Sequence, residues 1–388
     1  MKKLIAAAVA AAVIAPAMAI AAGPTLYGKI HTSIDYLDNN TSNNEGTKYK
    51  EWAMSSNSSR IGVKGSEDLG NGMKVGYLIE WGVSMDGNKG GKDMSLRNRA
   101  ITLSGDWGTA LAGRWDSPMK TFGRKIDLFN DQVGNTRSII TSVGLAKNGT
   151  INNRNGTINN RASNVVAYVT PNMNGFSSTI AYVIDAGTGV NLSGDDSDAS
   201  AWSFNAIYKN GPLMAGVAYV DYNEDGRVPT GGARPADRDN SSAWRVGGTY
   251  KFGDLKVAAS YVDMESQNFT KDIDPSIWTL GAAYTMGNNT IKMQLVDRDD
   301  SGLKTCNGGN SAANSGALKC KDGATMWSVG LDHKMSKRTT VYAAYSDIDN
   351  NKNSISTPWT NSGHDGSANS PSIGNDADAF SVGIIHKF

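Results

Sequence analysis

Apolar and polar residues alternate along most of the chain with a period of two. In residues 278–286 every second side chain is apolar, from Trp278 to Met286, and small or polar residues lie between them. Residues 73–85, 244–252 and 380–388 repeat the pattern. Because successive side chains of a strand point to opposite faces, the alternation predicts β-strands with one apolar face and one small or charged face.

Two kinds of sheet present such strands, a soluble β-sandwich and a membrane barrel. A sandwich packs its apolar face against a second sheet. Here the second face is rich in Gly, Ser, Thr, Lys and Arg, which suits a wet interior. The apolar face often starts or ends with Trp, Tyr or Phe, as the two aromatic girdles of a membrane barrel require. The pattern therefore favours the barrel.

Short and long spacers alternate between the predicted strands. Seven spacers are short, for example Gly253-Asp254, and eight are longer polar stretches, of which residues 116–160 are the longest. Fifteen spacers join sixteen strands. A sheet in lipid must close, because an open edge leaves backbone groups unpaired. We therefore predict an all-β fold: a transmembrane, antiparallel up-and-down barrel of sixteen strands, which is wide enough to hold an aqueous channel.

The first residues have the order of a secretory signal peptide. Lys2 and Lys3 precede an apolar stretch over residues 4–14, and small residues follow Pro16. We expect cleavage after Ala21, with Ala19 as the second choice. The alternative, a membrane anchor, needs a span of about 20 residues, and the stretch is shorter. Residues 1–21 are thus the predicted signal peptide, and residues 22–388 are a single barrel domain.

Composition alone suggests a soluble protein, because only 39% of the 388 residues are hydrophobic. Hydropathy averages over both faces of each strand, so its mean describes neither face. The 38 basic residues less Lys2 and Lys3 leave 36, against 37 acidic ones. This balance lacks the strong basic charge of nucleic-acid-binding proteins, and we expect no nucleic-acid partner.

Enzyme motifs are missing from the sequence. The four histidines are scattered, and there is no nucleophile elbow, zinc-protease motif or phosphate-binding glycine loop. We expect no catalytic residue, no cofactor and no metal.

Cys306 and Cys320 lie together in the seventh long spacer. In an oxidising compartment a disulfide is the natural interpretation. The alternative, a metal site, lacks nearby His or a C-x-x-C spacing.

Several segments, in order along the chain, resemble the general diffusion porins of Gram-negative bacteria. They are residues 25–30, 59–72, 97–118 and 164–171, and the chain ends on an aromatic residue, Phe388. A perfect tandem repeat, residues 148–154 and 155–161, departs from the family pattern. We interpret the repeat as a surface insertion, since loop length costs little stability.

The resemblance implies a homotrimer in the outer membrane, in contact with lipid and lipopolysaccharide. It implies that the third long loop folds into each pore and that basic wall residues face acidic residues on this loop. It also implies that Phe388 is a signal read by the barrel-assembly machinery.

Strand parity and the resemblance together select the residues of a pore constriction. Parity places Lys29 and Arg60 inward, and Arg97 and Arg99 share a face where the alternation is poor. The predicted basic wall is Lys29, Arg60, Arg97, Arg99, Arg114 and Arg161, and the predicted acidic loop residues are Asp116, Asp127 and Asp131. Because Lys120, Arg124 and Lys125 dilute the acidic side, we expect a weak preference for anions.

The sequence therefore predicts a water-filled channel for passive diffusion of small hydrophilic solutes and ions. One alternative is a substrate-specific porin for a sugar, phosphate or organic acid. Another is an adhesin or receptor barrel whose outer loops bind a partner.

Overall fold

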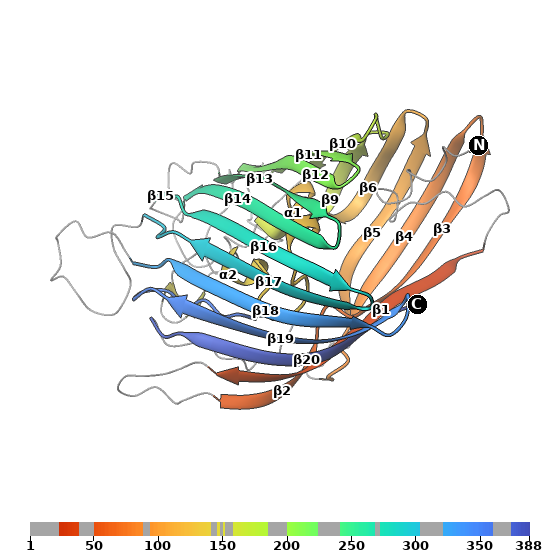
Figure 1. Cartoon of the computed structure of the whole chain (residues 1–388). Coiled ribbons are helices and arrows are strands. Elements are labelled where there is room, and N and C mark those ends of the chain that lie inside the picture. Colours follow the sequence, from red (N-terminus) through yellow and green to blue (C-terminus); the bar gives the residue numbers. More distant parts are fainter. Residues whose placement is uncertain are drawn as a thin grey trace.

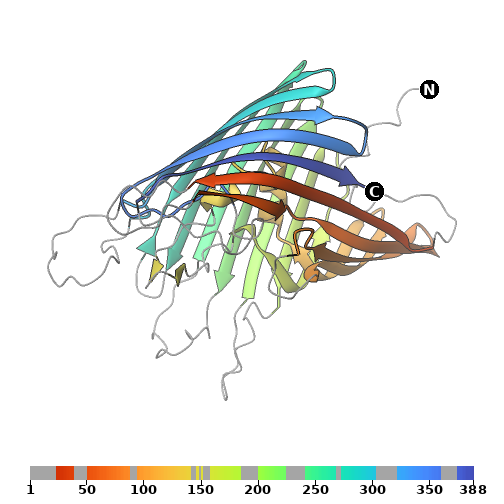
Figure 2. The same ribbon diagram turned by 90° about the horizontal axis from the view of Figure 1, so that it is seen from below.

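The chain folds into a barrel-shaped antiparallel sheet (Figures 1 and 2). The computed structural model describes residues 23–38, 50–87, 94–140, 146–147, 150–151, 158–184, 200–223, 241–267, 272–302, 321–359 and 374–388. The predicted signal peptide, the predicted Cys306–Cys320 disulfide and most of the tandem repeat lie outside the described residues.

Sixteen antiparallel barrel strands, one of them in two pieces, are present in the described ranges, as the spacer count predicts. They are β1 (Thr25–Asp38), β2 (Lys50–Ser56) with β3 (Arg60–Gly70), β4 (Met73–Val83), β5 (Met94–Gly105), β6 (Gly108–Asp116), β9 (Arg161–Val169), β10 (Phe176–Val183), β11 (Ser200–Asn210), β12 (Leu213–Asn223), β13 (Ser241–Phe252), β14 (Leu255–Gln267), β16 (Ser276–Met286), β17 (Asn289–Arg298), β18 (Ala324–Lys334), β19 (Thr339–Asn350) and β20 (Ala377–Lys387).

The second barrel strand is the one in two pieces. β2 pairs with the end of β1, and β3 pairs with its beginning, so both extend along the same neighbour. Ser58 lies between them with a positive φ of 57° and interrupts the ladder. Three two-residue strands stand outside the barrel count: β15 (Asp272–Ile273) pairs with the end of β14, and β7 (Ala146–Lys147) pairs with β8 (Thr150–Ile151).

The first and last strands close the ring. β1 pairs with β20 from Lys29 opposite Lys387 to Asp38 opposite Asp378. At the seam, the Gly28 and Phe388 backbones exchange two hydrogen bonds of 3.0 and 3.2 Å. Closure pairs the backbone groups that an open edge would leave unsatisfied in lipid.

The two faces of the wall differ as the alternation predicts. Trp278 and Leu280 are more than half exposed on the outer face, whereas Thr279 between them is buried on the inner face. Aromatic pairs lie on the outer face at both ends of the strands. Tyr36–Trp52, Tyr182–Trp202 and Trp327–Tyr345 lie toward the long loops, and Trp107–Tyr168 and Tyr250–Phe252 lie toward the short turns. These are the positions of the two girdles of a membrane barrel. None of the helices in the described ranges has the length and apolar character that a membrane crossing needs.

Between β6 and β9 the chain turns to the inner side of the wall. We call residues 117–140 the inner segment; it holds α1 (Pro118–Ile126) and α2 (Arg137–Ile140) (Figure 1). α1 starts at an N-cap, where the Ser117 side chain accepts a hydrogen bond from the Lys120 backbone N–H, and Pro118 occupies the first turn. Both residues are typical of helix starts, because the first N–H groups of a helix lack internal partners.

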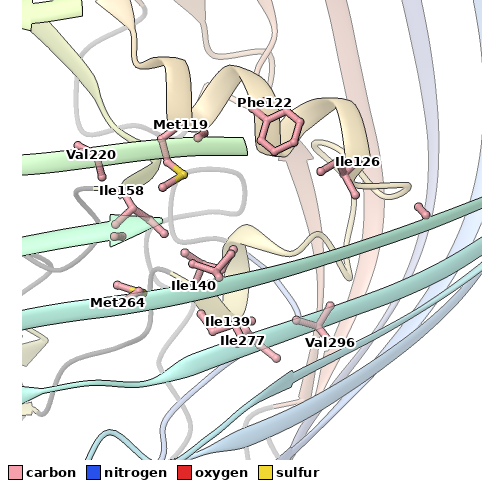
Figure 3. Close-up of a cluster of buried hydrophobic side chains, with 14 of the residues drawn as sticks. Met119, Phe122, Ile126, Ile139, Ile140, Ile158, Val220, Met264, Ile277 and Val296 are labelled. Atoms are coloured by element: carbon pink, nitrogen blue, oxygen red, sulfur yellow. The ribbon is translucent and has the colours of Figure 1, made fainter. Parts of the chain in front are cut away.

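The inner segment packs on a part of the wall that is apolar on its inner face. Met119, Phe122, Ile126, Ile139 and Ile140 are buried against apolar side chains from β11 to β19 (Figure 3). The wall contributes Ile207, Ala218, Val220, Ala243, Ala258, Val262, Met264, Ile277, Val296, Met326 and Ile348. The expectation of a small or charged inner face is therefore wrong for this part of the barrel. Leu128 packs against Gly281 of β16. A Cβ at this position would lie 2.8 Å from the leucine side chain, so the glycine leaves room for the inner segment.

Substitution of Gly28 tests the seam. A Cβ there would overlap the Phe388 ring and lie 2.7 Å from the Arg60 backbone carbonyl. We expect Gly28→Ala to lower the midpoint of thermal unfolding of the refolded mature chain, because closure must then open locally. Gly23→Ala is the control, since nothing lies within 4 Å of a Cβ at that position. Equal midpoints for the two variants would contradict this role of Gly28.

Candidate functional site

The inner segment meets the basic side of the wall through Asp131. Its carboxylate lies 2.8 Å from Lys29 Nζ on β1 and 2.8 Å from Arg124 Nη2 on α1. The Lys29 and Asp131 side chains are only 8% and 6% exposed. The pair joins residues that are 102 positions apart in the sequence. A predicted wall residue and a predicted loop residue are thus brought together.

A second cluster lies on the wall itself, around Glu80 of β4. Arg60 Nε lies 3.4 Å from this carboxylate, and Arg97 Nε on β5 forms an ion pair with it. The Tyr27 hydroxyl donates a third bond to it, at 3.2 Å. Two predicted wall arginines therefore share a wall carboxylate rather than a loop carboxylate. The alternation in β4 predicts that the Glu80 side chain points inward. The alternation does not predict which basic residues Glu80 pairs with.

A third cluster forms where β6 ends. Asp116 lies 3.0 Å from Arg161 Nη2 at the start of β9 and 2.8 Å from Lys120 Nζ in the first turn of α1. Arg161 Nε also donates to the Asn98 side chain, at 2.6 Å. This cluster ties the start of the inner segment to two neighbouring strands.

Asp127, the third predicted loop carboxylate, has a different environment. One oxygen accepts hydrogen bonds from the Phe129 backbone N–H and from Gln294 Nε2 on β17, and the other accepts from the backbone and hydroxyl of Thr136. It forms no ion pair within the described ranges. Asp127 therefore holds the inner segment in shape and attaches it to the wall.

The structure places Arg99 and Arg114 on the outer face, which corrects their prediction as inner-wall residues. Arg99 lies directly opposite Ile79, an exposed residue of the outer face, and directly opposite Arg114 on its other side. The ladder between β4 and β5 shifts between Ile79 and Trp81, where β5 has one extra residue. This β-bulge reverses the face on which the following side chains lie. Arg97, before the shift, still reaches Glu80.

Further side chains bind the inner segment on the opposite part of the wall. Arg245 Nη1 donates to the Met119 carbonyl at 3.2 Å, and Lys292 Nζ donates to Gln132 Oε1 at 2.6 Å. Lys292 also pairs with Asp332 at 2.9 Å. These contacts were not predicted. The only signal for Arg245 is its inward parity beside the outward Trp244, which does not tell what it binds.

Positive charge predominates in and beside the three ion-pair clusters. Seven cationic side chains accompany three carboxylates: Lys29, Arg60, Arg97, Lys120, Arg124, Arg137 and Arg161, with Glu80, Asp116 and Asp131. Burial raises the pKa of Asp131, but Lys29 and Arg124 outweigh burial and hold this pKa well below its usual range. The carboxylate is therefore ionised at neutral pH and offsets part of this positive charge.

The closed ring, the apolar outer face and the two girdles define a transmembrane β-barrel of the outer-membrane type. The profile of the family described as Gram-negative porin matches residues 6–353. The chain therefore belongs to the Gram-negative porin family, and its place is the outer membrane.

Relatives and solved structures agree with this family. The chain is 28% identical over 194 residues to outer membrane porin protein 32 of Delftia acidovorans, covering 50% of this chain and 52% of that protein. It is 30% identical over 181 residues to major outer membrane protein P.IB of Neisseria gonorrhoeae, covering 45% and 47%. The matches thus span about half the length of these curated relatives. An anion-selective porin from Comamonas acidovorans has the same fold, with a TM-score of 0.72, 23% identity, and 94% and 99% of the two chains covered.

Replacement of Asp131 tests the pairing of the inner segment with β1. Asp131→Asn leaves Lys29 and Arg124 without their carboxylate, so we expect the free energy of unfolding to fall by about 3 kcal/mol at neutral pH. Because the pKa of Asp131 is depressed, this difference persists above the ordinary carboxyl pKa of about 3.9 and shrinks as pH falls below it.

Denaturant unfolding of the refolded barrel between pH 3 and pH 8 measures this difference. Lys321→Gln is the control. Lys321 forms an ion pair with Asp300, but its side chain is 70% exposed, and such surface pairs contribute about 0–1 kcal/mol to the free energy of unfolding. A difference for Asp131→Asn no larger than that of the control would show that the pair does not hold the segment.

Proposed function

We propose that the protein is a water-filled channel for passive diffusion of small hydrophilic solutes and ions across the outer membrane, and that it favours anions. The observation that carries this proposal is the excess of cationic side chains in and beside the three ion-pair clusters, seven against three carboxylates. The family is one of channels rather than enzymes, which supports permeation as the activity.

The proposed constriction is the space between the inner segment and strands β1 to β9. Its basic residues are Lys29, Arg60, Arg97 and Arg161, and its acidic loop residues are Asp116 and Asp131. Asp127 serves the attachment of the segment, and Arg99 and Arg114 face away. Two of the four wall bases pair with Glu80 on the wall, so the loop carboxylates neutralise only part of the basic side.

The excess charge acts on ions that cross this space. An anion meets an attractive potential and a cation a repulsive one, while neutral hydrophilic solutes keep polar partners throughout. The carboxylates weaken this attraction, so anions accumulate at the constriction without binding tightly there. The relative from Comamonas acidovorans that shares the fold is described as anion-selective, which supports the same sign of selectivity here.

Assembly of the channel is proposed from the sequence for the signal peptide and the disulfide, and from the family resemblance for the trimer and for Phe388. Residues 1–21 are removed on export, Cys306 and Cys320 form a disulfide, and three barrels associate into a homotrimer in contact with lipid and lipopolysaccharide. Phe388, whose backbone bonds to Gly28 at the seam, is the residue read by the barrel-assembly machinery.

A potassium chloride gradient across a planar bilayer tests the function. We expect channels whose reversal potential shows a chloride-to-potassium permeability ratio above one, because positive charge is in excess at the constriction. The absence of channels would contradict the proposed function, and a ratio clearly below one would contradict the proposed selectivity.

Neutralising one wall arginine tests the constriction. We expect Arg60→Gln to lower the permeability ratio several-fold, because one unit charge roughly 7 Å from the ion path in water changes the energy of an anion and of a cation by about 0.6 kcal/mol each, in opposite directions. Arg60 suits the test because its side chain is 24% exposed, more than that of Arg97. Arg338→Gln, in the exposed turn after β18, is the control for loss of a distant charge. Equal ratios for both variants would place Arg60 outside the ion path.

A further inference from the structure

Lysines line the inner edge of the barrel at its short-turn end. Six of the sixteen barrel strands carry a lysine as their last or next-to-last residue at this end. We call these residues the rim lysines: Lys74 (β4), Lys209 (β11), Lys251 (β13), Lys256 (β14), Lys334 (β18) and Lys387 (β20). Their strands are distributed around the ring, so the rim lysines surround this mouth of the barrel (Figure 1).

The alternation along the strands places all six side chains on the inner face. Lys387 lies directly opposite the inward Lys29 in the β1–β20 ladder. Lys251 and Lys256 lie directly opposite each other, and Lys256 is two residues from the inward Ala258. Each of the other three shares its face with an inward residue of the same strand: Lys74 with Glu80, Lys209 with Ile207, and Lys334 with Asp332.

The rim lysines are accessible, and they lack carboxylate partners. Four of the six side chains are exposed and two are half-buried. Within the described ranges none of them forms an ion pair. The carboxylate side chains at this end are Glu67, Asp68, Asp106, Asp254 and Asp332. Asp332 is already paired with Lys292, and Glu67 lies on the outer face, so positive charge is in excess around the mouth.

The rim lysines extend the positive charge of the inner segment to the end of the barrel. Lys125, near the end of α1, is exposed, and partial burial and then the charge of Lys209 lower its pKa. Like charges directly opposite each other destabilise a sheet, as Lys251 and Lys256 do here. The fold does not need this pair, so we look for its use in what enters the mouth.

An exposed lysine acts on ions mainly through its field. Its ammonium group is a compact, hydrated point charge, without the planar fork that binds one anion at two points. The field of exposed charges extends about 30 Å at 0.01 M salt but only about 3 Å at 1 M. Buried ion pairs such as Lys29–Asp131 are screened much less. Salt therefore separates an effect of the rim from an effect of the constriction.

We propose that the rim lysines are a second anion filter, which ranks anions by their charge and favours doubly charged anions, such as sulfate or a dicarboxylate, over chloride. The proposal rests on the proposed function, since it takes the protein to be a channel. Short turns of outer-membrane barrels face the periplasm, so the filter lies at the periplasmic mouth. The energy of an ion in a potential is proportional to its charge, so a rim that enriches chloride about threefold enriches a doubly charged anion about ninefold.

Reversal potentials in planar bilayers test the filter, with gradients of potassium chloride and of potassium sulfate. The test variant combines Lys209→Gln, Lys251→Gln and Lys256→Gln. At a mean salt concentration of about 0.01 M, three unit charges roughly 15 Å from the pore axis change the local concentration of a singly charged ion about twofold. Since potassium rises as anions fall, we expect the chloride-to-potassium permeability ratio to fall about fourfold and the sulfate-to-potassium ratio about eightfold. At about 1 M salt both ratios should equal those of the wild type.

The matched control changes the same three positions to arginine, which keeps the charge and should keep the wild-type ratios. If the glutamine variant does not fold, the remaining rim lysines provide a second one, which should shift both ratios in the same direction: Lys74→Gln, Lys334→Gln and Lys387→Gln combined.

Unchanged ratios at about 0.01 M salt overturn the proposal. So do equal falls for chloride and sulfate, a fall that persists at about 1 M, or an arginine variant that behaves like the glutamine variant. Absence of wild-type channels would overturn the proposed function and the filter together. Wild-type channels with unaffected ratios in the glutamine variant would overturn the filter alone.

Discussion

Lipid offers no hydrogen bonds to a backbone, and the rest of this structure depends on how the chain meets that constraint. A sheet that crosses a bilayer must pair its last strand with its first, which β20 and β1 do over ten residue pairs. Once the ring is closed, every strand has an outer face toward hydrocarbon and an inner face toward an enclosed space. The interior can then hold charges that the outer face tolerates only near the headgroups, and the inner segment is built into that interior.

The inner segment is fastened differently on its two sides. Toward β11–β20 it packs through buried apolar side chains such as Phe122 and Phe129, supplemented by bonds from Arg245 and Gln294. Toward β1 and β9 it is held by ion pairs through Asp131 and Asp116. The apolar side fills its part of the interior with close-packed side chains, whereas the ionic side keeps its buried groups charged by pairing them with opposite charges. The division explains why the candidate constriction lies against β1–β9.

Much of the fold follows from the sequence because a period of two is a local property. The strands, the alternation of turns and loops, and the outward aromatic residues could all be predicted from neighbours a few positions apart. The contact of Lys29 with Asp131 could be predicted only by family resemblance, since the residues are 102 positions apart. The apolar inner patch was missed because Ile277 and Met326 stand beside outward tryptophans, where both faces of the strand are apolar and parity is ambiguous. Arg99 was misplaced because one extra residue in β5 is invisible to a pattern that counts by twos.

That extra residue has a consequence for comparing this barrel with its relatives. Arg97 and Arg99 are two positions apart, and in a regular strand they would face the same medium; the bulge gives one to the aqueous interior and the other to the membrane surface. A regular ladder without the extra residue would place both arginines on one face while leaving the number of arginines unchanged. Alignments that match arginines by position through β5 would therefore equate a residue of the inner face with one of the outer face. The register of the β4–β5 ladder, rather than identity in an alignment column, decides which arginine of a relative is equivalent to Arg97 and which to Arg99.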